Sequence, residues 1–254
     1  MSRQLDRLYR RLATGFAFTF LFGGGGLLAV TVLPLASLLP GDRRARAQSI
    51  IQRIFRFYLG MVQALRLLRI ELLGQERLQS CRGAIIVANH PTLLDVVILM
   101  SLVPNAQCIV KNALWSHPFL GPLVRRAGYI RNDLDGESLI AAAAQALGSG
   151  GNMIVFPEGT RRSAGEATRL QRGFANIATM TGADVQLVWI TCTPPMLMKG
   201  APWWSIPEEP SVFRVTVDAC IAADAYRALP RRTVASRHLT RYVESYFAEK
   251  LANV

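Results

Sequence analysis

The chain has 254 residues, a formal net charge of +12 and a sequence pI of about 10.4, yet 51% of its residues are hydrophobic. Nucleic-acid-binding proteins are basic and polar, and the sequence shows no groove-reading motif, so that class is disfavoured. A basic and apolar chain fits a protein that lies on an anionic membrane surface. The length is sufficient for one large α/β domain with an appendage.

Few residues are available for a metal site, because the chain has only three histidines and its four cysteines form no CxxC pair. A bound zinc ion needs several closely spaced His, Cys or acidic ligands. The cysteines are predicted to be small buried hydrophobic residues in a reducing compartment. We therefore expect no bound metal.

The N-terminal segment joins a basic end to a long uncharged run. Residues 12–40 contain no charged side chain, and the run exceeds the roughly 20 residues that a spanning helix needs. We predict a retained hydrophobic anchor rather than a signal peptide, which is shorter and ends in a small-residue cleavage site. Gly23–Gly26 interrupts the run, and both flanks are basic, so a re-entrant hairpin and a kinked single span both stay open.

Apolar residues recur at helical spacing from Gln48 to Leu73, with arginines among them. This pattern predicts an amphipathic helix over 48–73, which either lies on the membrane or packs on the domain core. We therefore divide the chain into membrane-associating helices over residues 1–74 and an α/β domain over residues 75–254.

From residue 83 onward, apolar strand-like runs alternate with helical ones, punctuated by glycine and proline. The predicted strands are 84–88, 107–110, 153–156, 185–191 and 212–217. The predicted helices are 93–103, 138–147, 170–180 and 234–251. This alternation predicts an α/β fold with a sheet covered by helices.

His90 and Asp95 form an HxxxxD pattern between the predicted strand 84–88 and the predicted helix 93–103. A carboxylate at the start of a helix can contact an imidazole at the end of the preceding strand and fix its tautomer. The other ring nitrogen is then free to take a proton from a hydroxyl. This makes the two residues a candidate general base and its orienting partner. Thr92 and Asp95 also fit a helix capping box, and this structural alternative stays open.

A second polar stretch follows the apolar residues 153–155, at the predicted C-terminal end of a strand. Ligands bind at this edge of α/β sheets. Its candidate ligand-binding residues are Glu158, Gly159, Thr160, Arg161 and Arg162. Glycine permits close backbone approach, and arginine offers the fork geometry that suits phosphate oxygens. A turn with a solvated charge cluster is the alternative. Lys111 and Arg131 each follow a short apolar segment and are candidates to add positive charge to the same anion pocket.

The HxxxxD motif, followed by Phe156-Pro157-Glu158-Gly159-Thr160-Arg161, resembles the glycerophospholipid acyltransferase family, typified by 1-acyl-sn-glycerol-3-phosphate acyltransferases. The likeness covers residues 80–195, and the segment 111–121 is also similar to the family's stretch between the two motifs. The sequence departs from the family pattern at Gly128–Arg131, where an arginine comes sooner, and at 187–191, which lacks a Val-Pro pair.

The resemblance implies acyl transfer from an acyl-CoA or acyl carrier protein thioester, with no cofactor. His90 would act as general base, Asp95 would orient it, and residues 158–161 would bind the acceptor with its phosphate on Arg161. Lys111 and Arg131 would support the phosphate. The implied product is phosphatidic acid, made from 1-acyl-sn-glycerol-3-phosphate at the cytoplasmic face of the cell membrane.

Two alternatives stay open. The first is the same chemistry on another acceptor, such as a lyso-ornithine lipid, another lysolipid or a polyketide-like lipid. The second is a non-catalytic membrane lipid-binding protein. The donor, its chain length and the oligomeric state are left open by the sequence.

Overall fold

The structure, a computed structural model, describes residues 3–118, 120–161 and 170–252. The elements in chain order are α1 (Arg3–Val30), α2 (Val32–Ser37), α3 (Arg43–Ala64), β1 (Leu68–Leu73), α4 (Gln75–Ser80), β2 (Ile85–Ala88), α5 (Asp95–Leu102), β3 (Ala106–Val110), α6 (Asn112–Trp115), α7 (Gly121–Arg126), β4 (Ile130–Arg131), α8 (Gly136–Gly148), β5 (Asn152–Val155), α9 (Gly173–Thr181), β6 (Val185–Thr193), β7 (Ser211–Ile221), α10 (Asp224–Arg227) and α11 (Arg232–Ala252).

The strands form one sheet in the order β1-β7-β6-β2-β5-β3-β4. Strands β6, β2, β5, β3 and β4 run parallel, while β7 pairs antiparallel with β6 and parallel with β1. Because β2 lies between β5 and β6, its C-terminal end opens in the middle of the sheet's carboxyl edge. That edge also carries the residues that follow β5, β3 and β4. The predicted α/β fold is confirmed.

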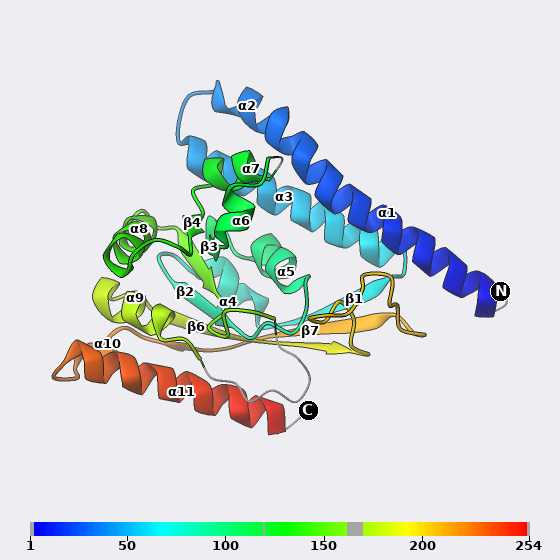
Figure 1. The fold of residues 1–254 in the computed structure, drawn as a ribbon. Helices are drawn as coiled ribbons and strands as arrows, with labels where there is room; N and C mark the ends of the chain where they lie inside the picture. The colour runs from blue at the N-terminus through cyan, green and yellow to red at the C-terminus, as the bar shows by residue number, and fades with distance from the viewer. Residues whose placement is uncertain (1–2, 119, 162–169, 253–254) are drawn as a thin grey trace.

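Helices cover both faces of the sheet (Figure 1). On one face α1, α3, α5 and α7 lie over the strands, and on the other face lie α8, α9, α10 and α11. Strand β2 is buried on both sides: Ile86 and Ala88 face the first core, and Ile85 and Val87 face the second. A continuous apolar run is typical of such a central parallel strand.

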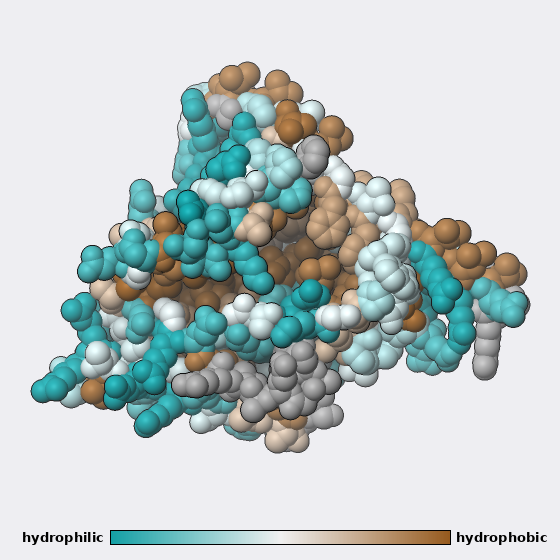
Figure 2. All heavy atoms as spheres, in the orientation of Figure 1, coloured by the Kyte–Doolittle hydropathy of each residue, from teal (hydrophilic) through white to brown (hydrophobic). Residues whose placement is uncertain are grey.

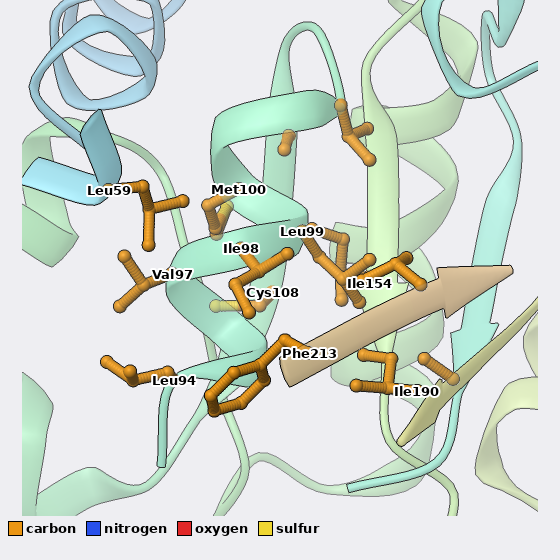
Figure 3. Packing of buried hydrophobic residues seen from close by; sticks show 14 of the residues in the cluster. Leu59, Leu94, Val97, Ile98, Leu99, Met100, Cys108, Ile154, Ile190 and Phe213 are labelled. Atoms are coloured by element: carbon orange, nitrogen blue, oxygen red, sulfur yellow. The ribbon is translucent and has the colours of Figure 1, made fainter. Parts of the chain in front are cut away.

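Helix α5 is the centre of the first core. Figure 3 shows its residues packed between α3 and the sheet, with Leu59 on one side and Ile154 and Ile190 on the other. Ile98 and Leu99 are 1% and 0% exposed. A rigid α5 matters for the site, because Asp95 is its first residue.

The region predicted as one helix over 48–73 divides into a helix and a strand, which corrects that prediction. Helix α3 begins earlier, where Asp42 caps it by accepting bonds from the backbone N–H groups of Arg44 and Ala45. The helix ends at Ala64, because Arg66 takes a left-handed conformation with a φ of 54°. Residues 68–73 then extend and pair with β7, so the boundary predicted at 74 falls after the first strand of the sheet.

Helix α3 packs on the α/β domain along one stripe. Its buried residues are Ala47, Gln48, Ile51, Tyr58, Leu59 and Val62. Polar residues on the same helix reach the C-terminal end of α5, where Arg56 Nε donates to the carbonyl of Ser101 at 2.8 Å and Gln52 Nε2 to that of Val103 at 3.0 Å. The packed stripe follows one of the two alternatives expected for this amphipathic helix.

Helix α1 runs unbroken through Gly23–Gly26, so the expected interruption within the uncharged run does not form there. Long apolar segments flank the glycines, and Gly25 lies close enough to Leu120 that an added Cβ would be 3.3 Å from its Cδ2. The stretch Gln4–Val30 is long and apolar enough to cross a membrane, and 28% of its most apolar window is buried. Figure 2 shows hydrophobic surface along both ends of this helix, which weakly suggests membrane association.

Candidate active site

The loop after β2 is tied to the neighbouring strand before the HxxxxD motif begins. The side chain of Asn89 accepts a bond from the backbone N–H of Ile190 at 2.7 Å and donates to its carbonyl at 2.8 Å. This pair of bonds fixes Asn89 against β6 and pins the start of the loop, so the position of His90 follows from two adjacent strands.

His90 and Asp95 contact each other directly. Nδ1 of His90 lies 2.9 Å from Oδ2 of Asp95, with the imidazole 15% exposed and the carboxylate fully buried. This contact fixes which ring nitrogen faces the carboxylate and leaves Nε2 as the nitrogen available for another partner. The pair predicted from the sequence spacing is therefore brought together by the fold.

The carboxylate of Asp95 also fixes the turn that precedes its own helix, whose N-cap residue is Leu94. The backbone N–H of Thr92 donates to Oδ2 at 2.7 Å, and the Thr92 hydroxyl donates to Oδ1 at 2.6 Å. The N–H of Leu94 in turn donates to the Thr92 hydroxyl at 3.2 Å. The capping box expected for Thr92 and Asp95 does not form in its usual pattern, because the Thr92 hydroxyl accepts from Leu94 and the N-cap Leu94 has no side-chain bond. The Thr92 bonds and the His90 contact coexist, since they use different lone pairs of the carboxylate.

Burial raises the pKa of the Asp95 carboxyl above its ordinary value, because a buried carboxylate has lost its hydration. The hydrogen bonds from His90 and Thr92 oppose this rise by stabilising the charged form. Three donors hold this buried carboxyl group in place, and its contact with Nδ1 orients the imidazole.

Phe156 and Glu158 close the site from the strand next to β2. The Phe156 ring stacks on the His90 imidazole, with ring centroids 4.2 Å apart and an interplanar angle of 25°. Oε1 of Glu158 lies 3.4 Å from the backbone nitrogen of His90. The two motifs, far apart in the sequence, thus meet at the ends of β2 and β5, which pair in parallel.

Gly159 lets the second motif turn sharply. Its φ of +71° is left-handed, and an added Cβ would lie 2.3 Å from Nε2 of Gln171. Thr160 follows on the surface, and Arg161 turns back and is half-buried. Nη1 of Arg161 donates to the carbonyls of Leu197 at 3.1 Å and Met198 at 3.4 Å. Arg162 lies outside the described residues.

An apolar groove begins beside Arg161 and has a volume of about 740 Å³. One wall is helix α1, through Gly15, Phe18 and Phe22, and the other includes Leu93 and Trp203. Leu93 belongs to the loop between His90 and Asp95, so the groove runs from the polar site along the N-terminal helix. A hollowed hydrophobic surface is visible near the centre of Figure 2.

Lys111 and Arg131 lie further along the same edge of the sheet. Lys111 is exposed at the end of β3, two strands from β2, which corresponds to about 10 Å at the usual strand spacing. Arg131, at the end of β4, forms a two-pronged bond with Asp133, at 2.8 and 2.7 Å. This hydrogen bonding to Asp133 raises the pKa of Arg131 above its ordinary value. The fold brings neither residue into contact with His90.

Sequence reasoning missed Asn89, placed Thr92 only in a capping box, and gave Phe156 no role of its own. Asn89 precedes His90 and Thr92 follows it by two residues, and short polar residues that bond to the backbone at a strand-to-helix turn are a readable signal. The stacking of Phe156 on His90 had no local signal, because it depends on the pairing of β2 with β5. Within the described part of the chain, no three His, Cys, Asp or Glu side chains gather closely enough to hold a metal ion.

Comparison with known proteins shows what the segment that carries this site is similar to. A model of the acyltransferase family matches residues 69–192. The 1-acyl-sn-glycerol-3-phosphate acyltransferase of Cocos nucifera is 30% identical over 117 residues, which cover 43% of this chain and 38% of the relative. The beta form of the Homo sapiens enzyme of that name is 30% identical over 175 residues, which cover 62% of this chain and 59% of the relative. The chain thus matches less than two thirds of the length of each relative.

The fold has a counterpart among solved structures. The crystal structure of the 1-acyl-sn-glycerophosphate acyltransferase PlsC from Thermotoga maritima superposes with a TM-score of 0.68 at 22% identity, covering 97% of this chain and 98% of that one. This likeness extends over the N-terminal helices as well as the sheet. Residues 69–192, which carry both motifs, match the acyltransferase family.

Proposed function

We propose that the protein is a membrane-associated O-acyltransferase that moves a fatty acyl group from a thioester to the free hydroxyl of 1-acyl-sn-glycerol-3-phosphate, giving phosphatidic acid for phospholipid biosynthesis. The donor is acyl-CoA or acyl carrier protein. The observation that carries this proposal is the 2.9 Å contact between His90 Nδ1 and the buried Asp95 carboxylate, within a segment that matches the acyltransferase family. The names of the matched relatives support the choice of acceptor.

In this mechanism His90 first accepts a proton and later donates it. Nε2 takes the proton from the acceptor hydroxyl as its oxygen attacks the thioester carbonyl carbon. The tetrahedral intermediate collapses with cleavage of the carbon–sulfur bond, and the imidazolium returns its proton to the departing thiolate. The products are an ester and a free thiol. The charge that develops on the imidazolium lies beside the Asp95 carboxylate, which stabilises it.

The acceptor phosphate is proposed to bind at the carboxyl edge of the sheet, next to the cations that follow β5 and β3. Arg161 contacts the carbonyls of Leu197 and Met198 through Nη1, which orients its guanidinium at the mouth of the apolar groove. Lys111 approaches from β3 as an exposed point charge. Arg131 was predicted for the same role, but its guanidinium already has a carboxylate partner in Asp133, so the proposal rests on Arg161 and Lys111.

Glu158, Gly159 and Thr160 complete the acceptor side. The Glu158 carboxylate lies beside the backbone of His90, where it can accept from an acceptor hydroxyl and hold it near the ring. Gly159 keeps the turn tight enough for this approach. No metal or other cofactor takes part in the proposed reaction, whose co-substrate is the thioester itself.

A panel of acceptors tests the proposal. Purified protein is incubated with oleoyl-CoA and either 1-acyl-sn-glycerol-3-phosphate, lysophosphatidylcholine or a lyso-ornithine lipid, and the products are identified by mass spectrometry. The proposal expects phosphatidic acid, formed from the first acceptor and lost in the His90→Ala variant. If only another lysolipid is acylated, the proposed acyl transfer is retained and the proposed acceptor is wrong. Transfer to none of them, with folded protein, would favour a lipid-binding protein.

A further inference from the structure

A cluster of arginines lies at the N-terminal end of helix α1, away from Gly23–Gly26. The first turns of α1 and the segment before β7 enclose a cavity of about 230 Å³. It is lined by Arg7, Arg10, Arg11, Ile206, Pro207 and Glu208. None of these residues takes part in the proposed acyl transfer, so the cluster needs its own explanation.

Arg10 is the unusual member, because its guanidinium is buried and only partly satisfied. The residue is 4% exposed. Nη1 donates to the carbonyls of Pro207 at 2.9 Å and Glu208 at 2.6 Å. Nε and Nη2 are buried, and no described residue accepts a hydrogen bond from either. Buried donors in native proteins are almost always paired, so two on one side chain indicate a missing acceptor.

The identity of the two free nitrogens indicates the kind of acceptor. Nε–H and Nη2–H lie along one edge of the planar guanidinium and point in parallel, which is the edge that binds two oxygens of one carboxylate or phosphate. Nη1, on the other side, is occupied by the loop carbonyls, so the loop holds the free edge in place. The arrangement is a preformed fork for an oxyanion.

The charge around the cavity favours an anion from outside the chain. Three arginines line it, and Glu208 is the one carboxylate among the lining residues. That carboxylate pairs with Arg7 rather than with Arg10, and its side chain is 76% exposed. A tetrahedral phosphate group can place two oxygens on the Arg10 fork and still present others to Arg7 and Arg11.

The surroundings contain apolar surface at the level of the arginines. Leu5, Leu8 and Leu12 of α1 are each more than half exposed. A helix that rests in a bilayer by such residues brings the exposed Arg11, three residues after Leu8, to the depth of the lipid phosphates, while Arg10 faces the loop on the other side of the helix. One to two turns further along α1, Gly15 and Phe18 begin the apolar groove of the active site, which also leaves the phosphates of a bound coenzyme A within reach.

We propose that Arg7, Arg10 and Arg11 form a phosphate-binding site at the N-terminal end of α1, in which the Arg10 fork binds two oxygens of a phosphate group. The group is carried either by a phospholipid of the membrane surface or by coenzyme A.

The test uses the full chain and the substitution Arg10→Lys, which keeps the charge but removes the fork. Binding is measured to vesicles of three parts phosphatidylcholine to one part phosphatidylglycerol, and separately to free coenzyme A by calorimetry. Neither probe is the proposed product. Loss of the charge-assisted pair should weaken binding about tenfold for whichever probe the site accepts. A loss of affinity for vesicles alone identifies a lipid headgroup as the source of the phosphate. A loss of affinity for coenzyme A alone identifies coenzyme A as the source.

Three further variants separate the site from general charge and from folding. Arg241→Gln removes an exposed arginine from α11, on the opposite face of the sheet, and should leave both affinities within about twofold, as for a single screened surface charge. Arg11→Gln, at an exposed position, should weaken binding of the same probe, and this variant keeps the test valid if Arg10→Lys fails to fold. Glu208→Gln should strengthen binding of that probe, because the carboxylate that competes for Arg7 is lost. Unchanged affinity for both probes in folded Arg10→Lys and Arg11→Gln would overturn the proposal.

Discussion

The two halves of the candidate active site are built differently. On the proton-transfer side, every polar atom of Asp95 has a partner: Oδ2 accepts from His90 and from the backbone of Thr92, and Oδ1 from the Thr92 hydroxyl. On the acceptor side, Lys111 is exposed, Arg131 is engaged by Asp133, and Arg161 holds the backbone after β6. The first side is preorganised by its own hydrogen bonds, while the second is a set of cations supplied by separate elements along the edge of the sheet.

This contrast separates two kinds of specificity. Proton transfer needs a fixed distance and tautomer, which buried hydrogen bonds supply. Recognition of an acceptor phosphate needs positive charge within reach, and cations from separate elements supply it without the exact distance that proton transfer requires. We therefore expect substitutions on the His90 side to change kcat by orders of magnitude, and substitutions on the Arg161 side to change the KM for the acceptor.

The largest effect is expected for His90→Ala. Removal of a positioned general base lowers kcat by about 10²–10⁴-fold. The rate of phosphatidic acid formation from oleoyl-CoA measures it, and circular dichroism checks that the variant is folded. His117→Ala is the matched control, because this histidine lies beyond β3 at an exposed position and should leave kcat unchanged. Full activity in folded His90→Ala would rule out the general-base role.

Asp95→Asn should lower kcat by about 10²–10³-fold, since an amide neither stabilises the imidazolium nor enforces its tautomer as a carboxylate does. The KM for either substrate should change little. Thr92→Val is the control, because it removes the hydroxyl that donates to Oδ1 but keeps the backbone bond to Oδ2. An equal loss in both variants would mean that loop structure, rather than the charge of Asp95, controls the rate.

Arg161→Met should raise the KM for 1-acyl-sn-glycerol-3-phosphate by about tenfold or more, as expected when a charge-assisted hydrogen bond to phosphate is lost. The KM for the thioester should stay within a factor of about two. Arg172→Met, at an exposed position before α9, gives a matched loss of charge. Similar increases for donor and acceptor would contradict the assignment of Arg161 to the acceptor phosphate.

The smallest effect concerns stability away from the site. Asp218 of β7 accepts from the Tyr246 hydroxyl at 2.6 Å and pairs with Lys250 of α11 at 2.7 Å. Burial raises the pKa of Asp218, but the bonds to Lys250 and Tyr246 more than offset this, so the pKa lies below its ordinary value. A lowered carboxyl pKa contributes stability above the unfolded-state pKa, and this contribution is lost as the pH falls through the folded-state pKa.

Lys250→Met should therefore lower the free energy of unfolding by at most about 1 kcal/mol at pH 7, because the pair is partly solvated. The difference from the unsubstituted protein should shrink when urea unfolding is repeated near pH 3. A difference that persists in acid would mean that the methylene chain of Lys250, not its charge, stabilises α11 against the sheet.

The sequence predicted most of the sheet because its central strands are uninterrupted apolar runs. Strands β2, β3, β5, β6 and β7 fall within a few residues of their predicted positions. Strand β1 was assigned to a helix, since Leu65 and Leu68 continue the helical spacing of α3, although Arg69 and Glu71 alternate with apolar residues as in a strand. Strand β4 has only two residues and no periodicity to detect.

The site was predictable only where its contacts are local. His90, Thr92 and Asp95 lie within one turn, so spacing alone was enough to place the imidazole near the carboxylate. Phe156 stacks on His90 across two strands, and Arg161 turns toward residues after β6, which no local pattern indicates. The bond between Arg131 and Asp133 spans the turn that follows β4, and an arginine and an aspartate two residues apart are a pair that sequence reasoning could have considered.

The central claim is that His90 and Asp95 act as one unit in proton transfer, and a double-mutant cycle tests it most directly. The kcat values of His90→Ala, Asp95→Ala and the double variant are measured with one thioester and 1-acyl-sn-glycerol-3-phosphate. If Asp95 acts only through His90, the double variant will be no slower than His90→Ala alone. If the two losses multiply, the carboxylate contributes to the rate independently of the imidazole, and the proposed unit is contradicted.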